Sequence, residues 1–309
     1  MPFREVKKGD KPKIVDKSKP SAHDLEPPTK QGLQLSSPAI LSLGFLALIV
    51  IGTVLLSLPI ATIQPISILA AAFTATSAVT VTGLNVVDTA NYTTFGQLVI
   101  AALIQFGGLG FMTFAILVLT SLQGKMGLSG SITAQEALGT HSNQIGSTAK
   151  AVIKIAFITE GLGFLGLTLL LAPLKGLKDA MYEAFFLCIS AFNNAGFALN
   201  GNNMTAYVHQ PMISFIISLL IITGGIGFLV ILDIIKHKRW QKFTLHTKVM
   251  ILGTLALNII GCMGYWLLER HNAKTIGGLS EAGQWFASWF MAVTSRTAGF
   301  NNLDYSQVT

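Results

Sequence analysis

Apolar residues occur along the chain in runs of two lengths that alternate. A helix needs about 20 apolar residues to cross a bilayer, whereas a run of roughly 10 to 14 has the length of a re-entrant segment. The alternation therefore predicts units of spanning helix, short re-entrant helix, loop and second spanning helix. The long runs are Leu41–Leu58, Phe95–Leu122, Ala149–Ala172, Met212–Ile235 and Val249–Leu268, and the short runs are Ile66–Ala78, Ala180–Phe192 and Gly283–Val293.

Glycines recur at the same point of each unit. Every short run leads into a polar segment that ends on a glycine, and these glycines, Gly83, Gly196 and Gly299, are 113 and 103 residues apart. The long runs after the first two loops contain matching pentads, Gly107–Phe111 and Gly224–Phe228, 117 residues apart. Such self-similarity predicts a tandem architecture. We expect an all-α integral membrane protein of tandem helix–pore-loop–helix repeats, of which two and a half are present.

Composition and charge agree with a membrane protein. Charged residues make up 11% of the 309 residues and hydrophobic residues 51%, whereas soluble proteins carry about 25% charged residues. Most of the 21 Lys and Arg residues lie in segments 4–30, 125–154 and 236–248. Because cytoplasmic loops are enriched in Lys and Arg, we expect a multi-pass protein of the cell (inner or plasma) membrane with a cytoplasmic N-terminus. This orientation explains the basic balance, and no nucleic-acid partner is expected.

The predicted organisation has six parts. The first part, residues 1–36, is rich in Pro and Lys, a composition typical of disorder. Residues 1–36 form a disordered basic cytoplasmic tail, 37–122 the first repeat, 123–148 a cytoplasmic linker, 149–236 the second repeat, 237–248 a basic cytoplasmic linker, and 249–309 a partial third repeat with its first helix, pore helix and filter.

The polar loops are the candidate ion pathway. Irregular backbone is tolerated at membrane depth only where protein buries it or water lines it. A loop with glycine can turn successive carbonyl oxygens toward a dehydrated cation, and the short helix before it directs its partly negative C-terminal end to the same place. We predict no catalytic residue, but a filter whose carbonyls bind potassium. Its four layers are Thr80, Asn193 and Arg296; Val81, Asn194 and Thr297; Thr82, Ala195 and Ala298; and Gly83, Gly196 and Gly299.

Three charged residues in or near the apolar runs have different interpretations. A guanidinium facing the ion would repel it, so we expect Arg296 to point behind its loop, paired with a carboxylate or backbone carbonyls. Glu160 is the only carboxylate well inside a spanning run. A hydrogen-bonded packing role, or a position at the interface, is favoured for it over a direct functional role. Asp233 lies one turn before Lys236 and is interpreted as a capping or interface charge.

Four segments, Thr82–Asn85, Gln105–Thr113, Asn193–Phe197 and Ser295–Asn301, carry a family resemblance. Together they resemble the Trk/Ktr/HKT superfamily of potassium transporters, and the third loop is most similar to the Ktr-type membrane (pore) subunit. The resemblance implies a pseudo-fourfold pore of four repeats and potassium uptake, with sodium dependence. Relatives with Ser at the first loop glycine favour sodium, so Gly83 supports potassium.

The resemblance also implies partners. It implies a homodimer in membrane lipid, a cytosolic nucleotide-binding regulatory subunit and no organic cofactor on this chain. The basic run Lys236–Lys248 is a candidate docking surface, although cytoplasmic charge explains it equally well. Because the family has four repeats, we expect the chain to be a C-terminally truncated fragment that does not transport alone. The alternative is that another polypeptide supplies the rest.

Other function classes fit less well. A broken-helix secondary transporter of another cation is expected to show inverted repeats, whereas these units repeat in one orientation. A non-conducting membrane assembly subunit stays open, and insensitivity to a change at a loop glycine would identify it. The pentads lack the preceding strand and ribose-binding acid of a nucleotide loop, so we do not expect an enzyme.

Overall fold

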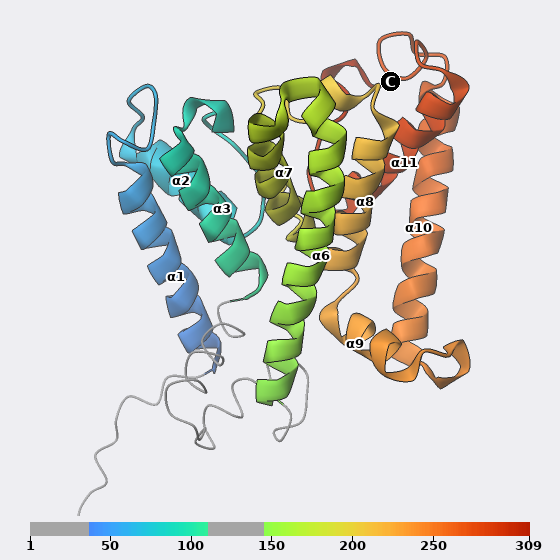
Figure 1. The fold of residues 1–309 in the computed structure, drawn as a ribbon, viewed down its shortest axis with the longest axis horizontal. Helices are drawn as coiled ribbons and strands as arrows, with labels where there is room; N and C mark the ends of the chain where they lie inside the picture. The colour runs from blue at the N-terminus through green and yellow to red at the C-terminus, as the bar shows by residue number, and fades with distance from the viewer. Residues whose placement is uncertain (1–36, 111–144) are drawn as a thin grey trace, which may run out of the picture. The chain divides into compact units, whose positions relative to one another are not determined.

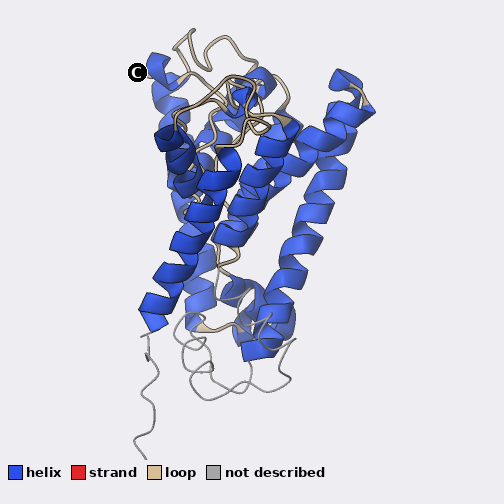
Figure 2. Cartoon of the chain, turned by 90° about the vertical axis from the view of Figure 1, so that its left-hand side faces the viewer, coloured by secondary structure: helices blue, strands red, loops and turns tan. Residues whose placement is uncertain are grey.

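The computed structural model describes residues 37–110 and 145–309 (Figure 1). The tail 1–36, most of the linker 123–148 and residues 111–122 of the run Phe95–Leu122 lie outside these residues. Within the described ranges every regular element is a helix (Figure 2), which confirms the expected all-helical fold. The α-helices are α1 (Ser37–Leu56), α2 (Ile68–Val79), α3 (Thr94–Gly108), α6 (Ile145–Lys175), α7 (Leu177–Phe192), α8 (Pro211–Gly225), α9 (Phe228–His237), α10 (Leu245–Glu269) and α11 (Glu281–Thr297), and the short 3₁₀ helices are η2 (Thr89–Asn91), η4 (Thr205–Tyr207), η5 (Trp240–Lys242) and η6 (Tyr305–Gln307).

Local chemistry explains where the short helices begin. The side chains of Ser67 and Ser280 cap α2 and α11 by accepting the N–H groups of Ala70 and Gly283, as serine does at helix N-termini. α7 follows α6 after one residue, because Gly176 adopts φ 84° and turns the chain sharply. The three predicted short helices are thus confirmed as α2, α7 and α11. α2 is shifted by one or two residues at its ends, and α7 and α11 are a few residues longer than predicted.

The units lie side by side in chain order. α2 packs on α1 and α3, α7 packs on α6 and α8, and α11 packs on α10 (Figure 1). Neighbouring units meet where α3 packs on α7 and where α8 packs on α11. Buried aromatic side chains cross these junctions: Phe186 and Phe197 join the core of the first unit, and Phe290 and Phe300 join the core of the second. The cores of the first and second units are therefore each completed by apolar side chains of the following unit.

Several helices have lipid-compatible length and surface. Lys150–Lys175 within α6 and Leu245–Glu269 (α10) are long and apolar enough to cross a membrane, and α8 with α9 would make a third span if the bent pair were counted as one. Large apolar side chains such as Leu162, Leu169 and Ile260 are exposed on these helices. An apolar face without protein cover is what a bilayer requires.

The run Met212–Ile235, which was expected to span the membrane, forms two helices joined by a bend. α8 ends at Gly225, and the helix axis turns by 94° before Val230–His237. Gly227 adopts φ 97° at the turn, a backbone conformation open mainly to glycine. The apolar pattern continues through the bend, which is why hydropathy alone did not show it.

Candidate functional site

The first loop closes α2 with a Schellman arrangement. The N–H of Val81 donates to the carbonyl of Ala78 at 3.2 Å, and the N–H of Thr82 donates to the carbonyl of Ser77 at 2.9 Å. This pair of bonds places one residue in the left-handed region, and here it is Val81, with φ 55°. A β-branched side chain in that region is a genuine outlier. Strain of this kind gathers at functional sites.

The second loop repeats the same closure on α7. The N–H of Asn194 donates to the carbonyl of Ala191 at 3.1 Å, and the N–H of Ala195 donates to the carbonyl of Ser190 at 2.7 Å. Asn194 takes the left-handed position with φ 58°. Two segments 113 residues apart thus share one backbone design.

The third loop is built differently. α11 continues through Arg296 and Thr297, beyond the predicted end at Val293. The N–H of Gly299 donates to the carbonyl of Thr294 at 3.2 Å, and the Thr294 hydroxyl bonds both the N–H and the carbonyl of Phe300, at 2.7 and 2.9 Å. Two of the predicted filter residues therefore occupy the last helical turn, and a buried threonine fixes the chain beyond them.

The three loops meet at their glycines. Gly83, Gly196 and Gly299 all have positive φ, at 78°, 73° and 71°. A Cβ atom on Gly83 would collide with the carbonyl oxygen of Ala195, and one on Gly196 would collide with the carbonyl oxygen of Ala298. The structure therefore brings the third and fourth predicted layers of neighbouring loops into direct backbone contact.

The glycine pentads hold the ends of the short helices. A Cβ on Gly107 would collide with the carbonyl of Val79, the last residue of α2, and a Cβ on Gly224 would collide with the carbonyl of Phe192, the last residue of α7. In both units the first glycine of the pentad thus lets the second long helix approach the start of the loop. The recurring pentad therefore sets how closely the second long helix packs against the end of the short helix in both units.

A hydrogen-bond chain links the interior of α6 to the second loop. Gln105 on α3 donates from Nε2 to Glu160 Oε2 at 3.1 Å, and Asn193 donates from Nδ2 to Gln105 Oε1 at 2.7 Å. Glu160 is 7% exposed, which fits the hydrogen-bonded packing role favoured from sequence. The role of Gln105 was missed, although the residue begins one of the four family-like segments.

Arg296 contacts the first helix of its own unit. Its Nη1 donates to the side-chain oxygen of Asn258 on α10 at 3.5 Å. Among the described residues no carboxylate pairs with it. The expected carboxylate or backbone partner is therefore wrong, and an amide side chain takes that place.

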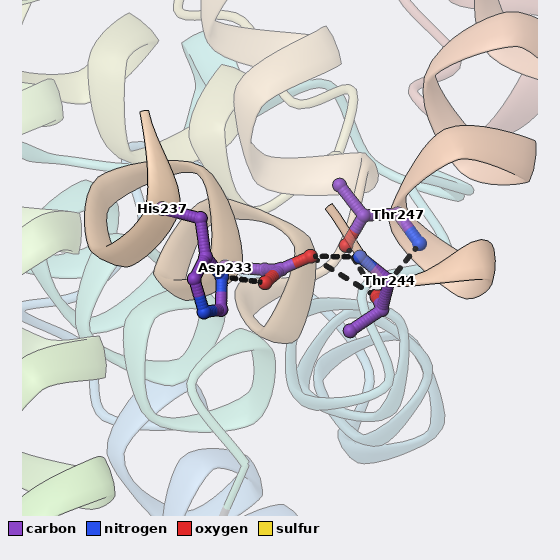
Figure 3. Close-up of polar contacts among 4 residues, drawn as sticks. All are labelled: Asp233, His237, Thr244 and Thr247. Atoms are coloured by element: carbon purple, nitrogen blue, oxygen red, sulfur yellow. Dashed lines mark hydrogen bonds and ion pairs between the residues drawn. The ribbon is translucent and has the colours of Figure 1, made fainter. Parts of the chain in front are cut away.

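Asp233 caps the start of α10 from the neighbouring helix (Figure 3). Its Oδ2 accepts the N–H of Thr244 at 2.9 Å and the Thr244 hydroxyl at 3.0 Å, and its Oδ1 lies 2.6 Å from Nδ1 of His237. Thr244 is the N-cap residue of α10 and also accepts the N–H of Thr247. The capping interpretation is confirmed, and the contact fixes α9 against α10 beyond the bend.

A carboxylate follows the third loop. The hydroxyl and the N–H of Ser306 both bond Oδ1 of Asp304, at 2.8 and 3.0 Å. These bonds hold the pKa of Asp304 below its usual value, so the side chain stays negatively charged. In the part of the chain that the structure describes, no group of three or more His, Cys, Asp or Glu side chains could hold a metal ion.

Known proteins share this sequence over most of its length. The family model for the cation transport protein TrkH matches residues 39–309. The chain belongs to this family. The Trk/Ktr resemblance is therefore confirmed, the family is one of transporters and not of enzymes, and the apolar helices make this member a multi-pass membrane protein.

Named relatives agree with this placement. The Ktr system potassium uptake protein B of Bacillus subtilis is 46% identical, with 89% of this chain and 62% of that protein covered. The protein of the same name in Vibrio alginolyticus is 41% identical over 88% of this chain and 61% of that protein. The potassium/sodium uptake protein NtpJ of Enterococcus hirae is 36% identical, covering 89% of this chain and 62% of its own length. This chain thus spans about three fifths of the length of the curated relatives it matches.

A solved structure shares the fold. The potassium transporter TrkH from Vibrio parahaemolyticus superposes with a TM-score of 0.59 at 19% sequence identity, over 90% of this chain and 54% of that one. At this identity the similarity concerns the arrangement of the helices.

Proposed function

We propose that this chain is part of a potassium uptake protein and that potassium passes between its loops at Thr80–Gly83, Asn193–Gly196 and Arg296–Gly299. The contact of Gly83 with the Ala195 carbonyl and of Gly196 with the Ala298 carbonyl carries the proposal. Three segments far apart in sequence meet there, backbone to backbone. The relatives named as potassium uptake proteins support the choice of ion.

The chemistry of the loops favours a cation. α2, α7 and α11 all end at the loops, so the partly negative ends of three helix dipoles converge there. Carbonyl oxygens can replace the hydration shell of potassium, and the geometry of the first and second loops is set by main-chain bonds. The differing side chains at Val81 and Asn194 are compatible with a binding surface made of backbone.

We infer a pseudo-fourfold pore, to which this chain contributes three of four filter segments. Residues 37–122, 149–236 and 249–309 are the first, second and partial third repeats, joined by the cytoplasmic linkers 123–148 and 237–248. The contacts of α3 with α7 and of α8 with α11 support a ring in chain order. The longer relatives have room for the remaining segment, and on this view the 309 residues are a C-terminally truncated fragment.

Ion coupling and partners follow by analogy with the relatives. One relative is named for both potassium and sodium, which supports sodium dependence, while Gly83 supports potassium as the ion selected. We propose a homodimer in membrane lipid with a cytosolic nucleotide-binding regulatory subunit and a cytoplasmic tail 1–36. Lys236–Lys248 lies beyond the bend of α8 and α9 and is the proposed docking surface.

Growth of bacteria that lack their own potassium uptake systems tests this function. The strains express the longest reading frame that contains this chain, as wild type, Gly196→Ala or Gly253→Ala, and the 309 residues alone. Gly196→Ala places a methyl group against the Ala298 carbonyl, whereas a Cβ on Gly253 meets no atom within 4 Å. We expect rescue at low external potassium by the wild type and Gly253→Ala only. Equal rescue by Gly196→Ala would exclude the loops as the pathway.

A further inference from the structure

One side chain after the second loop contacts two loops at once. Asn203 lies before η4 and adopts φ 53°. Its Nδ2 donates to the carbonyl oxygen of Gly196 at 3.0 Å, and its Oδ1 accepts the backbone N–H of Asn301 at 3.2 Å. A single amide thus joins the end of the second loop to the chain that follows the third.

A main-chain bond lies beside this amide. The N–H of Met204 donates to the carbonyl of Asn301 at 2.9 Å. Both backbone groups of Asn301 are therefore bonded to the segment after the second loop. Two adjacent bonds of this kind resist a sliding or hinging movement of one loop against the other, which a single bond would allow.

The segment that carries Asn203 is itself fixed to α7 and α6. Glu183 on α7 is 5% exposed, and its Oε1 accepts Nδ2 of Asn200 at 2.9 Å and the hydroxyl of Tyr207 at 2.5 Å. Nζ of Lys175 lies 2.6 Å from the other oxygen. Because every oxygen of the buried carboxylate has a partner, the segment is held firmly on both sides of Asn203.

We propose that Asn203 is a positioning residue for ion selectivity, which orients the Gly196 peptide and sets the spacing between the second and third loops. This inference rests on the proposed function of the loops. A carbonyl oxygen has two lone pairs, so the Gly196 oxygen can accept the Asn203 amide and still face an ion. Among the residues that the structure describes, Gly196 is the only filter glycine whose carbonyl receives a side-chain hydrogen bond.

Two substitutions separate the bonds of Asn203 from its backbone conformation. Asn203→Asp keeps the shape and the acceptor for Asn301 but replaces the donor to Gly196 with an oxygen. Asn203→Gly keeps the left-handed backbone, which glycine adopts readily, and loses both side-chain bonds. Asn202→Asp is the matched control, since it adds the same charge one residue away and leaves these bonds in place.

The readout is the ratio of potassium to sodium uptake in cells expressing the longest reading frame that contains this chain. The ratio is a property of each folded molecule and does not depend on the amount of protein in the membrane. If one hydrogen bond biases the filter, both Asn203 variants should lower the ratio by roughly fivefold. Asn202→Asp should keep the wild-type ratio.

Three results would overturn the inference. A wild-type ratio in Asn203→Asp would show that the donor to Gly196 is not needed, and a wild-type ratio in Asn203→Gly would show that only the backbone conformation matters. An equal loss in Asn202→Asp would assign the effect to charge. Gly196→Ala in the same assay separates the claim that the loops form the ion pathway from the claim that Asn203 positions them. Normal uptake by Gly196→Ala would contradict the proposed function, and the inference about Asn203 would fail with it.

Discussion

The first and second loops have the same backbone but different support. Both close their helix with the same pair of main-chain bonds and both place one non-glycine residue in the left-handed region. They differ in their further hydrogen bonds, because the second loop is bonded to side chains outside it and the first loop is bonded within itself. Local hydrogen bonds therefore specify the loop conformation, and neighbouring elements decide how firmly it is held.

The support of the second loop comes from side chains outside the loop. Asn193 is bonded to Gln105 of the first unit, and Gly196 is bonded to Asn203. The first loop has a local bond instead, between the hydroxyls of Thr80 and Thr82 at 2.7 Å. The same loop backbone can therefore be stabilised by a hydrogen bond inside the loop or by side chains outside it. Substitutions at these side chains should distinguish the two kinds of support.

The largest loss of stability is expected at the pentad glycines, which contact the end of the short helix in the same way in both units. Gly224→Ala and Gly107→Ala each force a methyl group into a backbone carbonyl at the end of a short helix. Overpacking of this kind costs up to about 3 kcal/mol, so both variants should melt well below the wild type in detergent. Gly253→Ala should melt like the wild type. A normal melting temperature for either pentad variant would contradict the close approach.

The next effect should be confined to the second loop. Gln105→Leu leaves Asn193 and Glu160 without their shared partner, and a buried polar group left unpaired costs about 1–3 kcal/mol. Glu160→Gln keeps an acceptor for Gln105 and serves as the matched variant. Thermal melting should show a clear loss for the first and little change for the second. Equal losses would mean that the Glu160 charge, and not the hydrogen-bond chain, supports the loop.

A reciprocal exchange tests the left-handed positions. Val81→Asn should stabilise the first loop and Asn194→Val should destabilise the second, each by about 1 kcal/mol, because asparagine tolerates this region and valine does not. Opposite shifts in melting temperature are the expected result. Shifts of the same sign would show that packing of the side chains outweighs backbone strain.

The smallest effect belongs to the first loop alone. Thr82→Val removes the hydroxyl bond to Thr80 at an exposed site, where such a bond contributes about 0.5–1 kcal/mol. Its melting temperature should fall less than that of Gln105→Leu. A larger fall than in Gln105→Leu would contradict the expectation that a hydrogen bond at an exposed site contributes less than the buried bonds of the second loop.

Much of the fold could be predicted because it depends on short stretches of sequence. The short helices α2, α7 and α11 lie between apolar runs and glycine loops, and their predicted ends agree with the structure to within four residues. The family-like segments also placed Gly83, Gly196 and Gly299 at equivalent points, and all three have positive φ. These features depend on residue type at a single position, which a sequence pattern records directly.

What could not be predicted depends on distant partners or on helix direction. The 94° turn after α8 occurs within an apolar stretch, and only the recurrence of Gly227 hinted at it. α11 extends through Arg296, whose side chain donates to Asn258 on another helix. The bond of Gln105 to Asn193 joins residues 88 positions apart, and the bond of Asn203 to Gly196 crosses a connection without regular structure. No local pattern carries that information.

The most direct test of the pathway is to locate the ion. The protein encoded by the longest reading frame that contains this chain would be crystallised with rubidium in place of potassium, and anomalous difference density would be measured. The account predicts rubidium between the three loops, within coordination distance of the backbone carbonyls that precede Gly83, Gly196 and Gly299. Ordered loops with no rubidium between them, and rubidium bound elsewhere in the membrane region, would contradict it.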